Sequence, residues 1–437
     1  MGRSNRKKLS ELVEIKHGFA FPGKHIVSRE TNRILMTPGH FALGGGFRHN
    51  NKKYFDSSDY RDGYELESGD LVVTMTDLSK TGDTLGYGAV IPQIKDKILL
   101  HNQRVGKVVL KSAELDKNFC HYLLRSKSYR HHVLETCTGS TVKHTSPTKI
   151  LDYEFDLPEI SDQKAIAHIL GTLDDKIELN QKMNQTLEEI AKTIFKSWFV
   201  DFDPVRANAE GRPTGLPSEI SDLFPDELVD SEIGEIPKGW EVVPLDQIGN
   251  FRNGLALQKY PPVNGEEQLP VIKIAQLRKG STLGDDLFAS GVPSDYVIDD
   301  GDYVFSWSGS LMAKYWVGGK GALNQHLFKV EEKTQPLWFI AGWVEHFMPE
   351  FQSIAESKAT TMGHIKREHL KQAMCVIPPG ETIDQCGDAI NPLKDRAIYS
   401  QLETRVLADL RDTLLPKLIS GEIRISDAEK FLEEAGI

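Results

Sequence analysis

The stretch Leu173–Phe199, LDDKIELNQKMNQTLEEIAKTIFKSWF, decides the fold of this 437-residue chain. Apolar and amide side chains recur in it at alternating intervals of four and three residues, at Leu173, Ile177, Asn180, Asn184, Leu187, Ala191, Ile194 and Trp198. This is the a/d spacing of a coiled-coil seam, so we expect a helix from about Asp162 to Phe199 that pairs with another helix. The amides at its centre cost stability but fix the register of pairing.

A second helix is expected from about Ile383 to Ile419. Its apolar stripe contains Ile390, Leu393, Ala397, Ile398, Leu402, Val406, Leu410 and Leu414. Pro392 and Pro416 fall near its two ends, where a proline is least harmful. We expect the two helices to form an antiparallel coiled coil. A helix of ~38 residues spans roughly 57 Å, so the pair would act as a spacer between two domains. The alternative is that each helix packs onto its own domain.

The second half of the chain repeats the first, and the matches occur in the same order. The paired segments are 8–21 with 244–257, 68–76 with 300–308, 100–110 with 323–332, and 139–158 with 359–378. The first pair aligns Lys16 with Arg252, and the third aligns Asn102 with Asn324. Apolar runs such as 70–76, 99–110 and 303–307 predict strands, whereas 118–136 and 337–357 predict helices. The fold class is therefore α+β, with two repeated mixed α/β domains and two long spacer helices.

These patterns divide the chain into five segments. We expect a first domain over 1–158, the central spacer helix over 159–200, a linker over 201–240, a second domain over 241–378, and the C-terminal spacer helix and tail over 379–437. The linker is rich in Pro, Gly and acidic residues. Its apolar residues Phe202, Leu216, Phe224, Ile233 and Trp240 indicate that it is pinned to a surface.

The net charge of −11 is unevenly distributed. Residues 1–158 carry a net charge of +6, whereas 159–240 carry −9, 241–378 carry −3 and 379–437 carry −5. Because phosphate neutralisation supplies most non-specific affinity for nucleic acid, the first domain is suited to DNA and the second needs a local basic patch. No apolar run approaches the ~18 residues of a membrane span, and no secretory signal is evident. We expect a cytoplasmic protein whose four cysteines are buried or idle thiols.

No motif in the chain supports an active site. A GxxxxGK[ST] phosphate loop and a GxGxxG turn are absent, and Asn391–Pro392–Leu393–Lys394 lies in the second expected helix rather than in a base-gripping loop. Glu14–Ile15–Lys16 has no upstream Asp that would complete a metal nuclease site. We therefore expect neither catalytic nor metal-binding residues. A nuclease or methyltransferase with unfamiliar motifs remains an alternative, and so does a protein-binding scaffold.

The repeated polar segments are suited to reading DNA. Asn and Gln pair with adenine, and Arg and Lys pair with guanine or with phosphates. The candidate DNA-binding residues are Lys16, Asn102, Gln103, Arg104, Ser140, Thr141, Lys143, His144, Arg252, Asn324, Gln325, Thr360, Thr361 and His364. The segments 74–76 and 306–308 complete this set. For each residue alone, a satisfied loop polar group is the competing interpretation.

Three stretches of the chain resemble a known family. They are the central run LPEISDQKAIAHILGTLDDKIELNQKMNQTLEEIAKTIFKSWFVDFDPV (157–205), the following LFPDELVDSEIGEIPKGWEVVPL and the distal DLRDTLLPKLISGEIRI (409–425). They resemble the specificity subunits of type I restriction-modification enzymes, and the resemblance covers the whole chain. It implies two target recognition domains that alternate with two spacer helices.

The resemblance also implies a function. Such a subunit is not itself an enzyme; it reads a bipartite, asymmetric site on double-stranded DNA, one half per recognition domain. The spacer helices would set the unread gap and dock two methylation subunits, and the full complex would add two restriction subunits. S-adenosylmethionine, ATP and Mg would be bound by those partners, and this chain would hold no cofactor.

Overall fold

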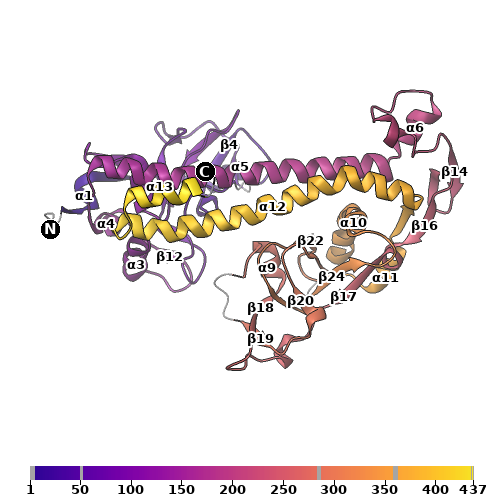
Figure 1. Ribbon diagram of the computed structural model, residues 1–437. Coiled ribbons are helices and arrows are strands. Elements are labelled where there is room, and N and C mark those ends of the chain that lie inside the picture. The colour runs from indigo at the N-terminus through magenta and orange to yellow at the C-terminus, as the bar shows by residue number, and fades with distance from the viewer. Residues whose placement is uncertain (1–4, 50–52, 283–286, 358–362, 435, 437) are drawn as a thin grey trace. The chain divides into compact units, whose positions relative to one another are not determined.

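The computed structural model describes residues 5–49, 53–282, 287–357, 363–434 and 436. The chain forms two compact units, one of residues 1–177 with 406–437 and the other of residues 178–405. Two 40-residue helices, α5 (Ile160–Phe199) and α12 (Gly380–Ile419), contribute residues to both units (Figure 1). The two expected long helices are thus confirmed.

The first unit contains short helices and many short strands. Its helices besides α5 and α12 are α1 (Leu9–Leu12), α2 (Lys117–Leu123), α3 (Lys127–Thr136), α4 (Pro147–Leu151) and α13 (Ile425–Glu434), with 3₁₀ turns at Gly23–His25 and Pro38–His40. Its strands are β1 (Arg6–Lys8), β2 (Val13–His17), β3 (Ile26–Val27), β4 (Arg33–Met36), β5 (Tyr54–Phe55), β6 (Glu65–Leu66), β7 (Leu71–Thr74), β8 (Thr76–Asp77), β9 (Gly88–Val90), β10 (Ile98–His101), β11 (Val105–Leu110), β12 (Lys143–His144) and β13 (Glu154–Asp156). The run 99–110 is therefore two strands that are separated by a turn.

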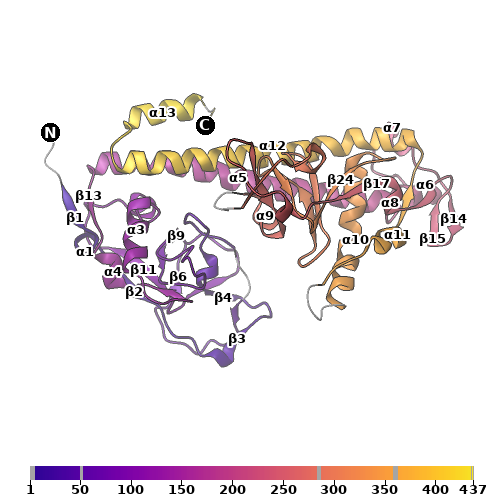
Figure 2. The ribbon, with the colours of Figure 1, turned by 90° about the horizontal axis from the view of Figure 1, so that it is seen from below.

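Side-chain caps and apolar faces explain these elements. The Asp116 carboxylate accepts hydrogen bonds from the first backbone amides of α2, and the Ser126 and Ser146 hydroxyls do the same for α3 and α4. The strands form a five-stranded sheet in the order β3-β5-β4-β10-β6 and a four-stranded sheet in the order β2-β11-β7-β9. Figure 2 labels some of these strands, among them β3, β4 and β6 of the first sheet and β2, β11 and β9 of the second. The largest apolar core of this unit joins the four-stranded sheet, α2 and α3 to the beginning of α5 and the end of α12.

The second unit has a similar set of elements. Its helices besides α5 and α12 are α6 (Asp203–Ala209), α7 (Ser218–Ser221), α8 (Leu245–Ile248), α9 (Ile274–Lys279), α10 (Leu337–Ser357) and α11 (Arg367–Gln372), with 3₁₀ turns at Leu257–Lys259 and Ser294–Tyr296. Its strands are β14 (Leu228–Ser231), β15 (Gly234–Pro237), β16 (Glu241–Pro244), β17 (Gly249–Asn253), β18 (Gln268–Ile272), β19 (Phe288–Ser290), β20 (Val297–Ile298), β21 (Tyr303–Ser306), β22 (Met312–Tyr315), β23 (Gly321–Leu323), β24 (Leu327–Glu332) and β25 (Met374–Ile377).

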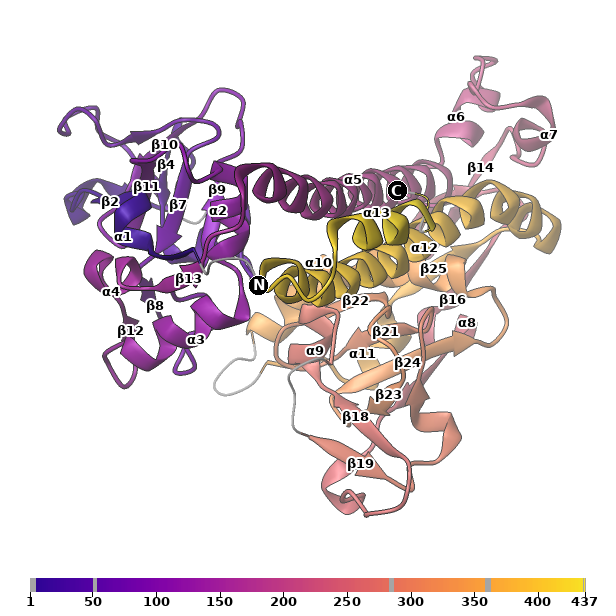
Figure 3. The ribbon, with the colours of Figure 1, turned by 60° about the vertical axis from the view of Figure 1, so that its left-hand side comes forward.

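The sheets of the two units share one topology. The four-stranded order β17-β24-β21-β22 repeats β2-β11-β7-β9, and all of these pairings are antiparallel. The parallel pair β18·β23, with β20 antiparallel beside it, repeats the parallel pair β4·β10 with β6 (Figure 3). The pair β16·β25 likewise repeats β1·β13. The expected repeat is therefore a repeat of the fold.

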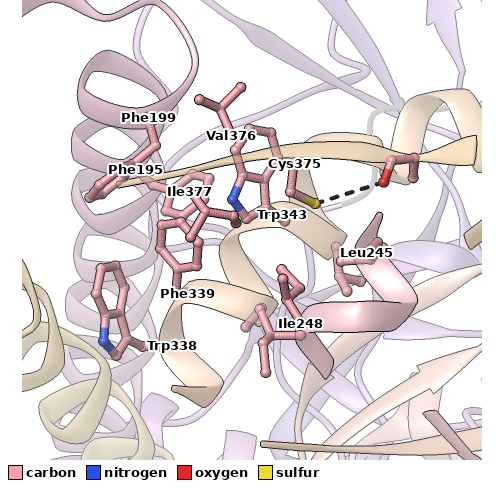
Figure 4. Close-up of a cluster of buried hydrophobic side chains, with 14 of the residues drawn as sticks. Phe195, Phe199, Leu245, Ile248, Trp338, Phe339, Trp343, Cys375, Val376 and Ile377 are labelled. Atoms are coloured by element: carbon pink, nitrogen blue, oxygen red, sulfur yellow. Dashed lines mark hydrogen bonds between the residues drawn. The ribbon is translucent and has the colours of Figure 1, made fainter. Parts of the chain in front are cut away.

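An aromatic cluster forms the core of the second unit (Figure 4). Phe195 and Phe199 of α5 pack on Phe339 of α10, with ring centroids 5.7 and 5.1 Å apart. The Trp343 ring meets Phe195 edge to face at 5.6 Å. This packing fastens the last turns of α5 to the rest of the second unit.

The segment 201–240, which was expected to be a linker, contains α6, α7 and the hairpin β14·β15. Phe202, Phe224 and Trp240 are buried in the core of the second unit, as their apolar character indicated. Ile233 is an exception, because its side chain is 45% exposed at the tip of the hairpin.

The two long helices pair antiparallel inside each unit. In the first unit the Arg411 Nη1 atom of α12 lies 2.7 Å from Asp174 Oδ1 of α5. In the second unit Asn180 Nδ2 donates to Glu403 Oε2 at 2.8 Å, and Gln401 Nε2 donates to Glu188 Oε1 at 3.1 Å. As the residue numbers of these contacts increase along α5, those of their partners in α12 decrease, so the two helices are antiparallel. Both helices also pack on the domain of each unit, so the alternative of one helix per domain is wrong.

The expected seam of α5 lies in the packed face. Leu173, Ile177, Asn180, Asn184, Ala191 and Trp198 are buried, and Leu187 and Ile194 are half-buried. In α12, Ile390, Ala397 and Leu414 are buried and Leu393, Leu402 and Leu410 are half-buried. Val406 is a correction: its side chain is 61% exposed, and the adjacent Leu407, at 3%, is the buried residue.

Three cysteines, Cys120, Cys375 and Cys386, are buried free thiols, and Cys137 is half-buried. In the part of the chain that the structure describes, no helix is long and apolar enough to cross a membrane.

Candidate nucleic-acid interface

In the first unit, three segments far apart in the sequence meet where β7 ends and β11 begins, at one end of the two central strands of the four-stranded sheet. The Met75 amide donates to the Arg104 carbonyl at 2.9 Å, and the Thr145 amide donates to the Met75 carbonyl at 3.0 Å. Strand β8 pairs with β12, which sets Thr76 opposite His144. The segments 75–77, 102–104 and 138–145 therefore come together, with Met75, Thr76, Asp77 and Asn102 buried beneath the others. The exposed side chains of 103–104 and 138–145 form what we name the first reading surface.

The second unit has the same arrangement. The Trp307 amide contacts the His326 carbonyl at 3.4 Å, and the Ile365 amide donates to the Trp307 carbonyl at 3.0 Å. Ser308 forms a β-bridge with His364, as Thr76 does with His144. The segments 307–309, 324–326 and 363–365 form the second reading surface. The aligned segments of the sequence thus meet in the same way in both halves.

The aligned asparagines, Asn102 and Asn324, are structural rather than exposed. Asn102 is 8% exposed and its Oδ1 accepts the Arg104 amide at 3.1 Å; Asn324 is 5% exposed and accepts the His326 amide at 3.3 Å. Each amide side chain therefore closes the turn on its own backbone. The burial of these two side chains and their hydrogen bonds to the backbone argue against the expected contact with bases.

A glycine faces each of these turns. A Cβ atom on Gly18 would lie 2.1 Å from the Asn102 carbonyl oxygen, and one on Gly254 would lie 2.3 Å from that of Asn324. Each strand therefore requires glycine where its backbone crosses the turn. The close backbone contact within each Gly–Asn pair gives a structural reason for these positions to repeat.

The other candidates of the first unit lie at the surface. Gln103, Arg104, Ser140, Thr141 and His144 are exposed, and Lys143 is half-buried. The His144 Nδ1 atom lies 3.2 Å from the Thr76 hydroxyl, which holds the ring on β12. This surface therefore combines amide, guanidinium, ammonium, hydroxyl and imidazole groups, the types that contact base edges and phosphates.

In the second unit the candidates are held more firmly. Gln325 Nε2 lies 3.4 Å from His326 Nε2, and His326 Nδ1 lies 3.0 Å from the Ser308 hydroxyl. His364 is half-buried, with its ring 6.4 Å from that of Trp307. Thr360 and Thr361 lie outside the described residues.

The aligned cations Lys16 and Arg252 differ in their surroundings. Lys16 is exposed on β2, 3.3 Å from Glu14. Arg252 on β17 lies 3.0 Å from Glu331 and 3.2 Å from Asp295, and the hydrogen bond to Glu331 raises the pKa of Arg252 above its ordinary value. Two carboxylates already neutralise this guanidinium, which argues against the expected contact with a phosphate.

Trp307 is absent from the fourteen candidates, although its segment was recognised as polar and repeated. Its indole is half-buried, its Nε1 donates to Asn253 Oδ1 at 2.9 Å, and its ring lies 5.9 Å from that of His326. A large aromatic side chain therefore stands at the centre of the second reading surface. The repeat aligns Trp307 with Met75 of the first domain, and this alignment was the feature of the sequence that could have singled out Trp307.

The side chains of these surfaces are of the types that bind bases and phosphates. Among the described residues, no group of three or more His, Cys, Asp or Glu side chains could hold a metal ion. The geometry defines a protein with two related polar surfaces on two similar domains and two long paired helices.

Comparison with known proteins gives the same class. Residues 2–189 and 237–404 match the family described as type I restriction modification DNA specificity domain. The MjaIX specificity subunit of Methanocaldococcus jannaschii is 26% identical over 352 residues, which cover 78% of this chain and 76% of that protein. The HindI specificity subunit of Haemophilus influenzae is 26% identical over 314 residues, 61% of this chain and 68% of that protein.

A solved structure shares the fold. The S subunit of a type I restriction-modification system from M. genitalium superposes with a TM-score of 0.54 and 14% identity, over 94% of this chain and 95% of that one. The chain belongs to the family of type I restriction-modification specificity subunits. It is a DNA sequence-specificity subunit and is not itself catalytic, as the sequence predicted.

Proposed function

We propose that this chain reads a bipartite, asymmetric site on double-stranded DNA, one half-site with the domain of residues 1–158 and the other with the domain of residues 241–378. Methylation subunits docked on the spacer helices then modify adenine. On unmodified DNA, restriction subunits cut in an ATP-dependent reaction.

One observation carries this proposal: the same three segments converge in each unit but carry different side chains. The exposed Arg104 of the first unit corresponds to the half-buried His326 of the second, and the buried Met75 corresponds to the half-buried Trp307. Thr76 and Ser308 are both buried and belong to the common backbone frame. A common backbone frame supports a common mode of docking, whereas different side chains favour different bases. Two such surfaces on one chain are suited to an asymmetric site with two halves.

The exposed residues suggest roles in the first half-site. A guanidinium such as that of Arg104 can donate two hydrogen bonds to guanine, and an amide such as that of Gln103 can pair with adenine. Lys143 and Lys16 are suited to phosphates, which set register without reading sequence. Each good pair with a base contributes roughly 1–3 kcal/mol of discrimination.

The partners follow from the family. We propose two methylation subunits, which bring S-adenosylmethionine, and two restriction subunits, which bring ATP and Mg. The acidic segments 159–240 and 379–437 suit protein contacts better than DNA contacts, because like charges repel phosphates.

The test is a genome-wide map of methylated adenines in cells that express this chain with its methylation subunits. We expect a two-part motif with a fixed gap that disappears when the gene is deleted. His144→Ala should change the first half of the motif and leave the second half intact. His131→Ala is the matched control, because His131 is exposed on α3 and lies outside both reading surfaces.

Two results would count against the proposal. Altered reading of the second half-site in His144→Ala would contradict one half-site per domain. Absence of any motif, with the partner subunits expressed, would favour the protein-binding scaffold.

A further inference from the structure

A single apolar side chain projects from the first reading surface. Leu78 directly follows β8 and is 68% exposed, more than any other large hydrophobic side chain that the structure describes. Its strand neighbours Thr76 and Asp77 pair with Lys143 and His144. Burial of exposed apolar surface is favourable, so a leucine at this position favours a partner that covers it.

The loop that carries Leu78 is built to hold its shape. The Asp77 carboxylate accepts the Ser79 amide and the Thr84 hydroxyl at 2.6 Å each. Burial raises the pKa of Asp77, but the hydrogen bonds from Thr84 and Ser79 outweigh it and leave that pKa below its ordinary value. At the far end of the loop, the Arg130 guanidinium donates to the carbonyls of Gly82 and Leu85. Leu78 is thus presented on a fixed turn and not on a loose loop.

The charges around Leu78 indicate what covers it. Lys80 is exposed two residues later. Gly82 packs beside the Lys143 side chain, since a Cβ atom there would lie 3.4 Å from Lys143 Cγ. An apolar tip on a loop that carries Lys80 and packs beside the Lys143 side chain is complementary to a polyanion with an apolar interior, which describes stacked bases between phosphates.

The second unit lacks this feature at the corresponding place. After Ser308 the chain continues through Gly309 and Ser310 to Leu311, whose side chain is only 5% exposed, and then enters β22. The projecting leucine therefore belongs to the first domain alone, in a fold that is otherwise repeated.

We propose that Leu78 is an apolar wedge that enters the base stack of the first half-site and locally opens it. This inference rests on the proposed function, because it assigns the first reading surface to DNA. Leucine is among the side chains that unstack base steps in this way, and the cost of unstacking depends on the step. Leu78 would thus add specificity at a position that no hydrogen bond reads.

The test uses the complex of this chain with its methylation subunits and a duplex that carries the mapped site. 2-Aminopurine replaces the adenines of the first half-site one at a time, and its fluorescence rises where stacking is lost. We expect a severalfold rise next to one base step with the unaltered chain. Leu78→Ala should abolish that rise and weaken binding about tenfold. The separate signal from the adenine that is flipped for methylation should persist in the variant.

Two variants serve as controls. Leu78→Phe keeps a wedge-forming side chain and should retain the rise. Leu43→Ala removes another exposed leucine, 59% exposed, from a different loop of the same unit and should change nothing. If the unaltered complex binds the site without a rise outside the flipped adenine, or if Leu78→Ala retains the rise, the wedge is wrong and the proposed function stands. If the unaltered complex fails to bind the site, both are wrong.

Discussion

Asp174 of α5 joins several elements of the first unit. Its carboxylate lies 2.6 Å from Arg125 Nη1, 2.7 Å from Arg411 Nη1 and 2.9 Å from the Tyr122 hydroxyl. Burial raises the pKa of Asp174, but the two guanidinium groups outweigh burial and lower it to about 2. One carboxylate of α5 therefore ties α12 and the end of α2 together.

We expect Asp174→Asn to lower the free energy of unfolding by about 3 kcal/mol, because the buried Arg125 would lose its counter-charge. Arg411 would keep its contact with Asp412 at 2.7 Å. Urea denaturation at pH 7 measures this change. Asp175→Asn is the matched control, since Asp175 is the adjacent carboxylate of α5 and is exposed. Equal stability of the two variants would contradict a structural role for the ion cluster.

The same cluster predicts a dependence on pH. A lowered carboxyl pKa stabilises the folded state above the ordinary value of 3.8, and this stabilisation is lost as the pH falls from there towards about 2. The loss amounts to about 2 kcal/mol. Asp174→Asn should lack this part of the acid transition, which denaturation curves between pH 5 and pH 2 would detect. A variant with an unchanged acid slope would exclude Asp174 as its source.

At the residue scale, the sequence predicts which segments form the candidate surface but not which side chains point outward. Gln103 and Asn102 are neighbours of similar chemistry, yet the first is exposed and the second closes a buried turn. A short polar side chain satisfies its own backbone as readily as a ligand. The repeated glycines at Gly18 and Gly254 were the available sign of a tight backbone crossing.

At the element scale, the two long helices differ in how well their stripes predict burial. The seam of α5 follows one regular spacing, and its positions are buried or half-buried. The end of α12 packs against α5 and also beside α13, whose Ala428 and Leu432 are in the same core. A helix that packs against two apolar neighbours buries a wide part of its circumference. The spacing of apolar residues alone therefore could not predict that Leu407 is buried and Val406 is exposed.

Replacing the two amides of the α5 seam, Asn180 and Asn184, with leucine should change the stability in opposite directions. Asn184 is 7% exposed, and its Oδ1 has no hydrogen-bond partner among the described residues. Asn184→Leu should raise the free energy of unfolding by about 1–2 kcal/mol, because it removes a buried unsatisfied oxygen and adds apolar contact. Asn180→Leu should lower the free energy of unfolding, since it breaks the 2.8 Å bond to Glu403. Chemical denaturation compares the two, and a destabilised Asn184→Leu would show that its amide is needed.

At the scale of the whole molecule, the repeat was the most predictable feature. Four weak matches in one order were enough to predict two similar domains. Many sequences can form the same strands and turns, so each match is weak, but the order of the matches along the chain follows the order of the elements. The side chains on the reading surfaces were the least predictable, since Met75 and Trp307 occupy the same frame. The shared fold determines where the surface forms in each domain, whereas the side chains on that surface differ between the two domains.

The spacer model makes a prediction that the unit boundaries allow to be tested cleanly. One boundary falls after Ile177 in α5 and the other after Arg405 in α12. Insertion of four residues at both points preserves the contacts described within each unit, including Asp174–Arg411 and Asn180–Glu403. Each helix then gains about one turn, which is a rise of ~6 Å and a net rotation of ~40°.

The mapped methylation motif should respond to this insertion in its gap alone. One base pair of DNA rises about 3.4 Å and turns roughly 34°, so the added rotation matches one base pair and the added rise lies between one and two. We therefore expect unchanged half-sites separated by a gap that is one or two base pairs longer. The same insertion in α5 alone is the control, and it should abolish methylation because the paired helices lose register. An unchanged gap with both insertions would mean that the helices join the domains without measuring the distance between the half-sites.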